Sequence, residues 1–430
     1  MIYRVVNEER LPQVEELWDY CFEKREEPFF QYYFGEYAGK NNMVIGGFER
    51  VGPADAEGRQ REALRTMLHV NPYMLRLRGQ EQLAPYLVGV ATAPEARGQH
   101  AMEELLKTSF EVLRSEGFSF VTLMPIYAGI YLPYEFAYCY YGLQYKMQLA
   151  DLGRELAKAP GRELAVERVP VVGPRGEGAE QLGGDADAVA NAFAQLQELL
   201  ASLYATLTSA YNSVPKRTDF QWRKLLSVHA LEGMQCAVVY REGVPVGYML
   251  YYISKGCFTA HELLAADFAA RNRLLQFAAA HLSSAREFAW LAPAWDRTYL
   301  GFADQELTPQ LRPFMMARCL DARKALAAVQ VPAGAEEGSV VLLLTDKLID
   351  RNNHLLKLYV NSTSVEVKST IEQEEVIMDM GAFTQLYLGA FSATELFEAG
   401  RLRVRAGAEG KLALLDSLFP KQRNFINEYF

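Results

Sequence analysis

Apolar side chains recur at two different spacings along the chain, most clearly between residues 86 and 124. Residues 86–92 are a short, largely apolar run with the length of a buried strand. Residues 102–113 carry apolar side chains at every third or fourth position, which predicts one face of a helix. Residues 118–124 form a second apolar run. The pattern predicts a strand, a helix opened by Pro94 and the residues after it, and a second strand.

Similar patterns predict elements elsewhere in the chain. We expect a strand and a helix within 3–34, strands at 43–50, 68–77 and 137–149, a linker at 170–187, a helix at 188–207, a hairpin at 235–253, a strand, turn and helix at 261–281, a strand and turn at 339–353, a segment continuing into a helix at 369–389, and a short helix at 392–402.

Length and composition limit the class of protein. A chain of 430 residues is too long for one compact core, so two or three domains are expected. Hydrophobic and charged fractions of 50% and 23% are those of a soluble globular protein. The net charge of −9, with no basic tract, argues against a nucleic-acid partner. An acidic surface suits a cationic substrate.

The cysteines and the N-terminus indicate a reducing compartment. The five cysteines are scattered, odd in number and without a CxxC pair, so we expect free thiols and neither disulfides nor a metal site. The first residues carry charges where a signal peptide needs an apolar region. Apolar runs fall short of the roughly 20 residues that span a membrane. We therefore predict a cytoplasmic protein with no membrane partner.

A strand that leads directly into a helix leaves backbone N–H groups unpaired at the helix start, where phosphate oxygens bind well. Arg97 adds a positive charge there. Strand, turn and helix also occur in most α/β domains, so this spacing alone leaves a phosphate site as one of two readings.

Two motifs carry a resemblance to a known family. The sequence VGVATAPEARGQHA at 88–101, followed by an apolar helix and then IYLPYEF at 130–136, resembles the coenzyme loop and the active-site loop of GNAT acetyltransferases. The chain is most similar to the Eis (enhanced intracellular survival) type, over nearly all of its length. The resemblance implies an α/β (α+β) fold of tandem GNAT-like mixed sheets flanked by helices, plus a sterol-carrier-like domain. We expect the GNAT acetyltransferase domain at 1–150, a degenerate second GNAT-like domain at 151–303 and the sterol-carrier-like domain at 304–430.

The resemblance also implies acetyl-CoA as the co-substrate, whose thioester arm enters between two splayed parallel strands. The implied coenzyme-binding residues are Val90, Ala91, Thr92, Arg97, Gly98, Gln99, His100, Ala101, Met102, Glu103, Ile126 and Tyr127. Family loops usually have Gly where this chain has His100, whose side chain could narrow the cradle, bond a phosphate or point to solvent.

Acetyl transfer needs an acid for the departing thiolate, and a tyrosine hydroxyl with a pKa of about 10 can serve. Matching the family motif implies that Tyr131 is this general acid, whereas Tyr134 and Phe136 match packing positions. Pro133 and Glu135 depart from the usual basic residue and Gly of the loop. In Eis-type enzymes the chain's own terminal carboxylate accepts the substrate proton, which implies Phe430 as the base.

Glu26, Glu27 and Phe29 could bind an amine through charge and cation–π contact, and the other reading, which the residues alone favour, is a solvated charge run beside core aromatics. Together with Glu428 they are the expected substrate-binding residues. We predict direct transfer to a small polyamine- or aminoglycoside-like amine, in a homohexamer by resemblance. The alternatives are a non-catalytic acyl-CoA or lipid-binding protein, and a protein or peptide N-acetyltransferase.

Overall fold

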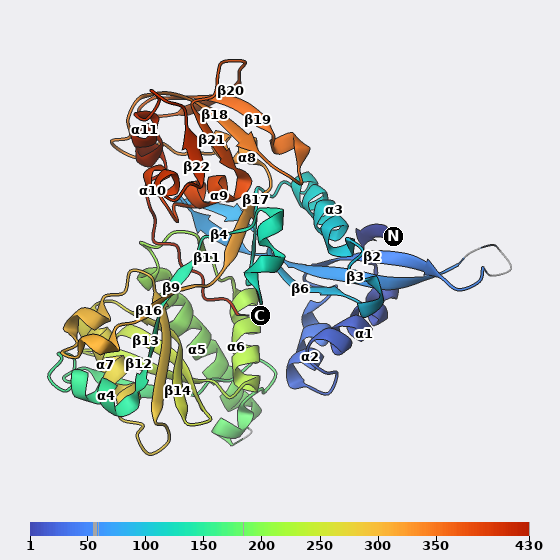
Figure 1. Cartoon of the computed structure of the whole chain (residues 1–430). Coiled ribbons are helices and arrows are strands. Elements are labelled where there is room, and N and C mark those ends of the chain that lie inside the picture. Colours follow the sequence, from blue (N-terminus) through green and yellow to red (C-terminus); the bar gives the residue numbers. More distant parts are fainter. Residues whose placement is uncertain (55–57, 59, 184, 430) are drawn as a thin grey trace. The chain divides into compact units, whose positions relative to one another are not determined.

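The computed structural model describes residues 1–54, 58, 60–183 and 185–429. The chain divides into two compact units, the first made of residues 1–140, 212–215 and 314–430, and the second of residues 141–211 and 216–313. Each is a mixed α/β assembly of sheets flanked by helices, as the sequence predicts (Figure 1).

The N-terminal sheet of the first unit has the strand order β1-β2-β3-β6-β7-β17-β8. Its strands are β1 (Ile2–Val5), β2 (Met43–Val51), β3 (Arg61–Asn71), β6 (Tyr86–Thr92), β7 (Phe120–Leu123), β17 (Met316–Cys319) and β8 (Ala137–Tyr138). Neighbours are antiparallel except β6 and β7. Residues 316–319 (β17) therefore supply an interior strand of this sheet, although they lie far along the chain from its other strands.

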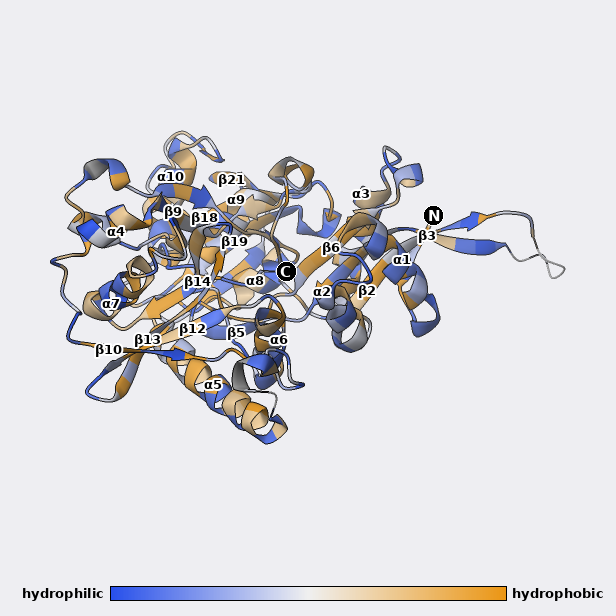
Figure 2. Ribbon diagram, turned by 90° about the horizontal axis from the view of Figure 1, so that it is seen from below, coloured by the Kyte–Doolittle hydropathy of each residue, from blue (hydrophilic) through white to orange (hydrophobic). Residues whose placement is uncertain are grey.

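Helices cover both faces of this sheet (Figure 1). Side chains alternate along β2, so that Ile45 packs toward α3 (Ala101–Ser115) while Val44 and Phe48 pack toward α1 (Leu11–Cys21). The short α2 (Pro28–Tyr32) joins the α1 side. The resulting burial explains why β6 is hydrophobic along its length (Figure 2).

A small sheet, β11-β4-β5, corrects one sequence expectation. The predicted strand 68–77 is interrupted, because β3 ends at Asn71 and β4 (Met74–Leu77) begins after Pro72, which has no backbone N–H to donate. β4 pairs instead with β5 (Gln80–Leu83) and with β11 (Val214–Pro215).

The C-terminal sheet of the first unit has the order β20-β19-β18-β21-β22. Its strands are β18 (Gly338–Thr345), β19 (His354–Val360), β20 (Val365–Ser369), β21 (Val376–Asp379) and β22 (Leu402–Val404), with helices α8 (Ala322–Ala327), α9 (Met380–Leu388), α10 (Ala393–Glu398) and α11 (Lys411–Leu418). One apolar cluster joins this sheet to the N-terminal one, since it includes Phe120, Met315 and Leu342.

The second unit is built on the sheet β10-β12-β13-β14-β15-β9-β16. The strands are β9 (Tyr141–Gln148), β10 (Ala165–Val169), β12 (Gln235–Arg241), β13 (Val244–Ser254), β14 (Cys257–Ala265), β15 (Glu287–Pro293) and β16 (Gln310–Pro313), with helices α4 (Leu149–Glu155), α5 (Ala186–Leu207), α6 (Asp219–Leu231) and α7 (Phe268–Ala279). The predicted hairpin, now β12 and β13, is confirmed. The division of the chain at residues 150 and 303 stays a prediction.

Candidate active site

Strands β6 and β7 separate soon after they begin to pair. Among the described residues they pair only at Tyr86↔Thr122 and Leu87↔Leu123. β6 continues to Thr92, whereas β7 ends at Leu123. Residues 90–92 therefore lie beyond the paired stretch, where an extended ligand arm can add to the strand edge.

A bulge bends β6 beside this separation. The register between β3 and β6 shifts after Met67↔Ala91, so Gly89 and Val90 lie at the irregular point. Gly89 has a φ of +57°, and a Cβ there would lie 2.3 Å from Cζ3 of Trp18. Only glycine fits this position.

The turn between β6 and α3 opens the helix start to a ligand. Gly98 and His100 have φ values of +72° and +57°, in the left-handed region. A Cβ at Gly98 would meet no atom within 4 Å. The first backbone N–H groups of α3 have no partner inside the helix and carry a partial positive charge, which favours an anion.

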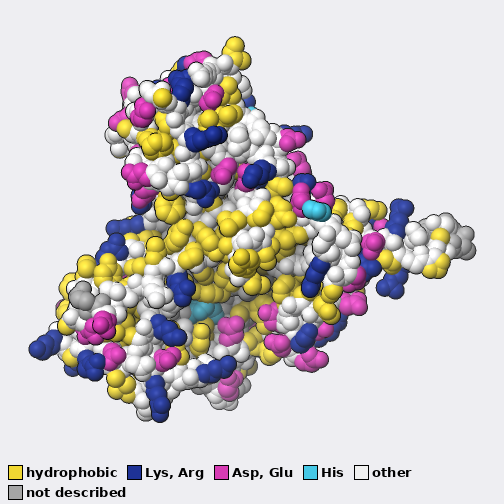
Figure 3. All heavy atoms as spheres, viewed as in Figure 1, with side chains coloured by type: hydrophobic (Ala, Val, Ile, Leu, Met, Phe, Trp, Pro, Cys, Tyr) yellow, Lys and Arg dark blue, Asp and Glu magenta, His cyan; other side chains and the backbone are white. Residues whose placement is uncertain are grey.

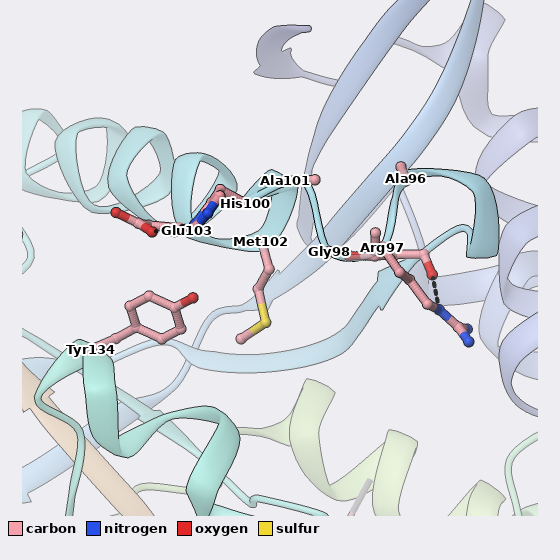
Figure 4. A pocket seen from close by; sticks show the side chains of 9 residues that line it. Ala96, Arg97, Gly98, His100, Ala101, Met102, Glu103 and Tyr134 are labelled. Atoms are coloured by element: carbon pink, nitrogen blue, oxygen red, sulfur yellow. Dashed lines mark hydrogen bonds and ion pairs between the residues drawn. The ribbon is translucent and has the colours of Figure 1, made fainter.

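A pocket of about 340 Å³ lies at this helix start (Figure 4). Its lining residues are Thr92, Ala96, Arg97, Gly98, His100, Ala101, Met102, Glu103 and Tyr134. Figure 4 shows Arg97 at one end and Tyr134 at the other, with the Met102 side chain between them. Most of the residues expected to hold the coenzyme phosphates are thus brought together in one hollow.

The polar side chains that line the pocket are those of Thr92, Arg97, His100, Glu103 and Tyr134. The Arg97 Nε donates to the carbonyl of Thr92 at 3.1 Å, which fixes the guanidinium at the pocket. The His100 side chain is 82% exposed, and its Nδ1 lies 3.2 Å from Oε2 of Glu103. Hydrogen bonds from Lys107 and His100 lower the pKa of Glu103. Because the His100 ring faces mostly solvent, the backbone cradle fits a pyrophosphate.

The other expected coenzyme residues lie outside this pocket lining. Ala91 is buried and Val90 is half-buried on β6. Gln99 donates to the carbonyl of Glu95 at 3.0 Å. Ile126 and Tyr127 are 93% and 69% exposed, at the start of the loop that follows β7.

Tyr131 lies between two 3-10 turns, Ala128–Ile130 and Leu132–Tyr134. Its ring packs against Phe136 with centroids 5.8 Å apart. Burial raises the pKa of Tyr131 to about 12, so the hydroxyl keeps its proton at neutral pH. The side chain is therefore a protonated phenol, and it packs against the apolar cluster that contains Leu87 of β6 and Leu123 of β7.

The C-terminal segment is buried within the first unit. Nδ2 of Asn424 donates to the carbonyl of Cys139 at 3.2 Å, and its Oδ1 accepts from Asn212 at 2.7 Å. Oε2 of Glu428 accepts from the Tyr73 hydroxyl at 3.2 Å. The ring of Tyr429 lies 5.1 Å from that of Phe314. Phe430, the expected base, lies outside the described residues.

Glu428 is surrounded by tyrosine hydroxyls. Burial raises the pKa values of Tyr37, Tyr73 and Tyr86, and the negative charge of Glu428 raises each further. Tyr131 acts on the pKa of Tyr86 in the same direction. Glu428, near the C-terminus, and Tyr131, in the loop after β7, thus both lie close enough to Tyr86 to raise its pKa.

The four expected substrate-binding residues occupy different environments. Glu26 and Glu27 are exposed, and Glu27 accepts from the backbone N–H of Lys24 at 3.0 Å. Phe29 stacks on Tyr33, with ring centroids 5.8 Å apart. Glu428 is only 5% exposed.

Sequence reasoning missed Tyr73 and Tyr86 as neighbours of Glu428. Tyrosine occurs 24 times in this chain, and no spacing distinguishes these two. The pairing of Tyr73 with a residue 355 positions away has no local sequence signal.

Arg217 and Glu262 form a buried ion pair in the second unit. Arg217 makes a two-pronged ion pair with Glu262 at 2.9 and 2.7 Å and lies over the rings of Tyr204 and Trp222. These four residues all belong to the second unit. His281 bonds the carbonyl of Phe277 at 2.9 Å.

Two properties of the described residues bear on other functions. None of their helices is long and apolar enough to cross a membrane. Their His, Cys, Asp and Glu side chains form no group of three or more that could hold a metal ion. All five cysteines have free thiols.

Family models match three regions of the chain. An acetyltransferase (GNAT) domain matches residues 2–139, a second acetyltransferase (GNAT) domain matches residues 214–319, and a sterol carrier protein domain matches residues 322–427. No curated protein matches the chain.

Solved structures share the whole architecture. A probable N-acyltransferase from Enterococcus faecalis V583 matches with a TM-score of 0.79 and 18% identity, covering 100% of this chain and 99% of its own. A GCN5-related N-acetyltransferase from Anabaena variabilis matches with a TM-score of 0.77 and 17% identity, covering 100% of both chains. Eis1 from Mycobacterium abscessus matches with a TM-score of 0.69 and 17% identity, again over 100% of both chains. At these identities the structures show a common fold, while the domain models give the class of enzyme, an acyltransferase. The chain therefore carries two acetyltransferase (GNAT) domains followed by a sterol carrier protein domain, on a fold similar to that of Eis1.

Proposed function

We propose that this protein is an acetyl-CoA-dependent N-acetyltransferase that transfers the acetyl group directly to a primary amine of a small cationic acceptor. The observation that carries the proposal is the pocket at the start of α3, beside the separation of β6 and β7 and with Tyr134 in its wall. The GNAT domain family implies an acyl-CoA co-substrate, and the N–H groups of α3 with Arg97 would hold its phosphates.

Acetyl-CoA, when bound, supplies an activated thioester. Tyr131 would donate its hydroxyl proton to the sulfur as the C–S bond breaks, because burial keeps that hydroxyl protonated. The new bond joins the acceptor nitrogen to the carbonyl carbon. The terminal carboxylate of Phe430 would take the proton that the amine loses, and the buried course of residues 424–428 supports this role.

Carboxylate side chains support the proposal that the acceptor is cationic. Glu428 is a buried carboxylate among tyrosines, and Glu26 and Glu27 are exposed beside Phe29. The chain carries a net charge of −9. On the face seen in Figure 3, acidic and basic side chains are interspersed, so attraction would come from these carboxylates and not from a uniform acidic field.

The first experiment offers acetyl-CoA and a panel of polyamines and aminoglycosides to the purified protein. We expect acetylated products by mass spectrometry at rates well above the no-enzyme control. If every amine gives only the control rate, the acceptor class is wrong.

A second experiment adds one alanine after Phe430. The free carboxylate is then displaced by one residue, so turnover should fall while the Kd for acetyl-CoA, measured by calorimetry, stays unchanged. An unchanged kcat would remove the terminal carboxylate from the mechanism.

The sterol carrier protein domain at 322–427 favours one alternative, a non-catalytic acyl-CoA or lipid-binding protein. Binding of acetyl-CoA without turnover for any amine or peptide would support it, and turnover with peptides alone would support a peptide N-acetyltransferase. We also propose a cytoplasmic homohexamer, supported by family resemblance and tested by analytical ultracentrifugation.

A further inference from the structure

Glu135 closes the loop that carries Tyr131, and it does so in an unfavourable backbone conformation. Its φ is +59°, in the left-handed region, where residues with a Cβ are strained. Its N–H donates to the carbonyl of Leu132 at 3.0 Å, which completes the 3-10 turn Leu132–Tyr134. A glycine would adopt this turn without strain. We therefore expect contacts of the Glu135 side chain to offset the strain of its backbone.

The Glu135 side chain is directed into a buried charged cluster. It is 5% exposed, and its Oε2 accepts from the backbone N–H of Lys347 at 3.2 Å. The same oxygen lies 3.9 Å from Nη2 of Arg318, a fully buried residue of β17. Arg318 in turn pairs with Asp346 at 2.6 Å.

This cluster joins three parts of the first unit. Glu135 belongs to the loop after β7, Arg318 to the interior strand β17, and Asp346 to the turn after β18. The guanidinium of Arg318 also lies over the ring of Phe110 in α3, 4.9 Å from its centroid. The loop is thus tied to the helix whose N-terminus forms the pocket.

We propose that Glu135 is a positioning residue for acyl transfer: its carboxylate, held by Arg318 and by the Lys347 backbone, fixes the loop that places Tyr131 beside the separated strands. This proposal deepens the proposed function and rests on it for the role of Tyr131. It does not require Glu135 to touch either substrate.

The attraction between Glu135 and Arg318, which fixes the loop, depends on the negative charge of Glu135. Burial, together with the carboxylates of Asp346 and of Asp379 at the start of α9, raises the pKa of Glu135, while Lys347 N–H and Arg318 oppose the shift. Arg401 lies 3.5 Å from Asp379 and partly offsets that charge. Because the Glu135 carboxyl group titrates above its ordinary acidic range, its ionisation and its attraction to Arg318 increase as the pH rises toward neutral.

The test compares Glu135→Gln with the wild-type protein. Gln keeps the shape of the side chain but removes the charge. We expect kcat to fall about tenfold with the KM for acetyl-CoA changed less than about twofold. We also expect the rise of kcat with pH that is assigned to Glu135 to disappear. Glu111→Gln, an exposed carboxylate on α3, is the matched control and should leave both unchanged.

A second measurement does not depend on catalysis. It is the protection of the loop peptide 126–136 from hydrogen exchange in the CoA-bound protein. After correction for intrinsic exchange, protection should increase with pH in the wild type and stay flat in Glu135→Gln. Equal protection and equal pH profiles in both proteins would overturn the proposal. A difference in protection without any acetylation would refute the proposed function and leave the positioning role standing.

Discussion

At the scale of single residues, Tyr131 is the side chain that the proposed mechanism uses as the general acid. Its half-buried ring packs against Phe136, and burial raises the pKa of its hydroxyl to about 12. A hydroxyl in this state stays protonated over the whole pH range in which the protein would work, as a general acid must.

Tyr131→Phe removes the proton donor and keeps the ring. We expect kcat to fall by about 10²–10⁴-fold with an unchanged Kd for acetyl-CoA, measured by steady-state kinetics and calorimetry. In the wild type, the raised pKa predicts no loss of rate from Tyr131 ionisation below about pH 10. Tyr20→Phe, at a site 64% exposed, is the control. A rate loss of less than about threefold in Tyr131→Phe would exclude the role.

His100 is a second residue whose environment makes a prediction. It has a φ of +57° without being glycine, and its side chain is mostly exposed. His100→Gly should relieve about 1 kcal/mol of backbone strain and raise Tm by a few degrees. Because the ring faces solvent, the Kd for acetyl-CoA should change less than about twofold. A large loss of affinity would instead show that the imidazole binds phosphate.

The sequence predicts the residues of the coenzyme pocket because they form one continuous local motif. Thr92 and Arg97 are only five positions apart, and they line the same hollow. Tyr73 and Glu428 are 355 positions apart, and their hydrogen bond depends on the course of the whole chain. Local patterns carry no signal for such a pair.

At the scale of elements, the C-terminal segment is an irregular segment held in place by a single β-bridge and by buried hydrogen bonds. Residues Asn212 and Asn424 form a parallel bridge, and the Phe425 N–H donates to the Asn212 carbonyl at 3.0 Å. The Asn424 side chain adds two hydrogen bonds from a position 7% exposed.

Asn424→Ala leaves the buried Asn212 amide and the Cys139 carbonyl each without this partner. We expect a loss of about 1–3 kcal/mol in the free energy of unfolding, measured by urea denaturation. Turnover should fall further than this loss explains, if the segment places the terminal carboxylate. Asn41→Ala, which removes a hydrogen bond of an exposed side chain, should cost less than about 1 kcal/mol. Equal costs for the two variants would contradict the anchoring role.

Hydrophobic spacing predicts elements well where one face is buried. The residues of β6, 86–92, are those expected from the sequence, and the helix expected at 102–113 is α3. The strand expected at 68–77 is interrupted at Pro72, and hydrophobic spacing carries no signal for the new partner of β4, which is residues 214–215 from far along the chain. Long-range pairing of this kind overrides the local pattern.

At the scale of the whole molecule, the compact units do not follow the order of the domains along the chain. The first unit contains both the N-terminal GNAT domain and the sterol carrier protein domain, which share one apolar cluster. The second unit lies between them in sequence.

We expect two heat-capacity transitions in differential scanning calorimetry, and not three, because a shared core unfolds cooperatively. A destabilising variant in each unit would show which transition belongs to which unit. Asn424→Ala should lower one transition, and Glu262→Gln, which weakens the buried pair with Arg217, should lower the other. Three independent transitions, or one variant shifting both equally, would contradict this division.

The place of β17 between β7 and β8 has a consequence for biosynthesis. When residue 140 leaves the ribosome, the first sheet still lacks an interior strand, and residues 316–319 follow only after on the order of ten seconds of translation. During that interval β7 and β8 present unfilled edges that invite wrong pairing between nascent chains. The yield of soluble protein should therefore depend on chaperone supply during synthesis more than on the stability of the finished molecule.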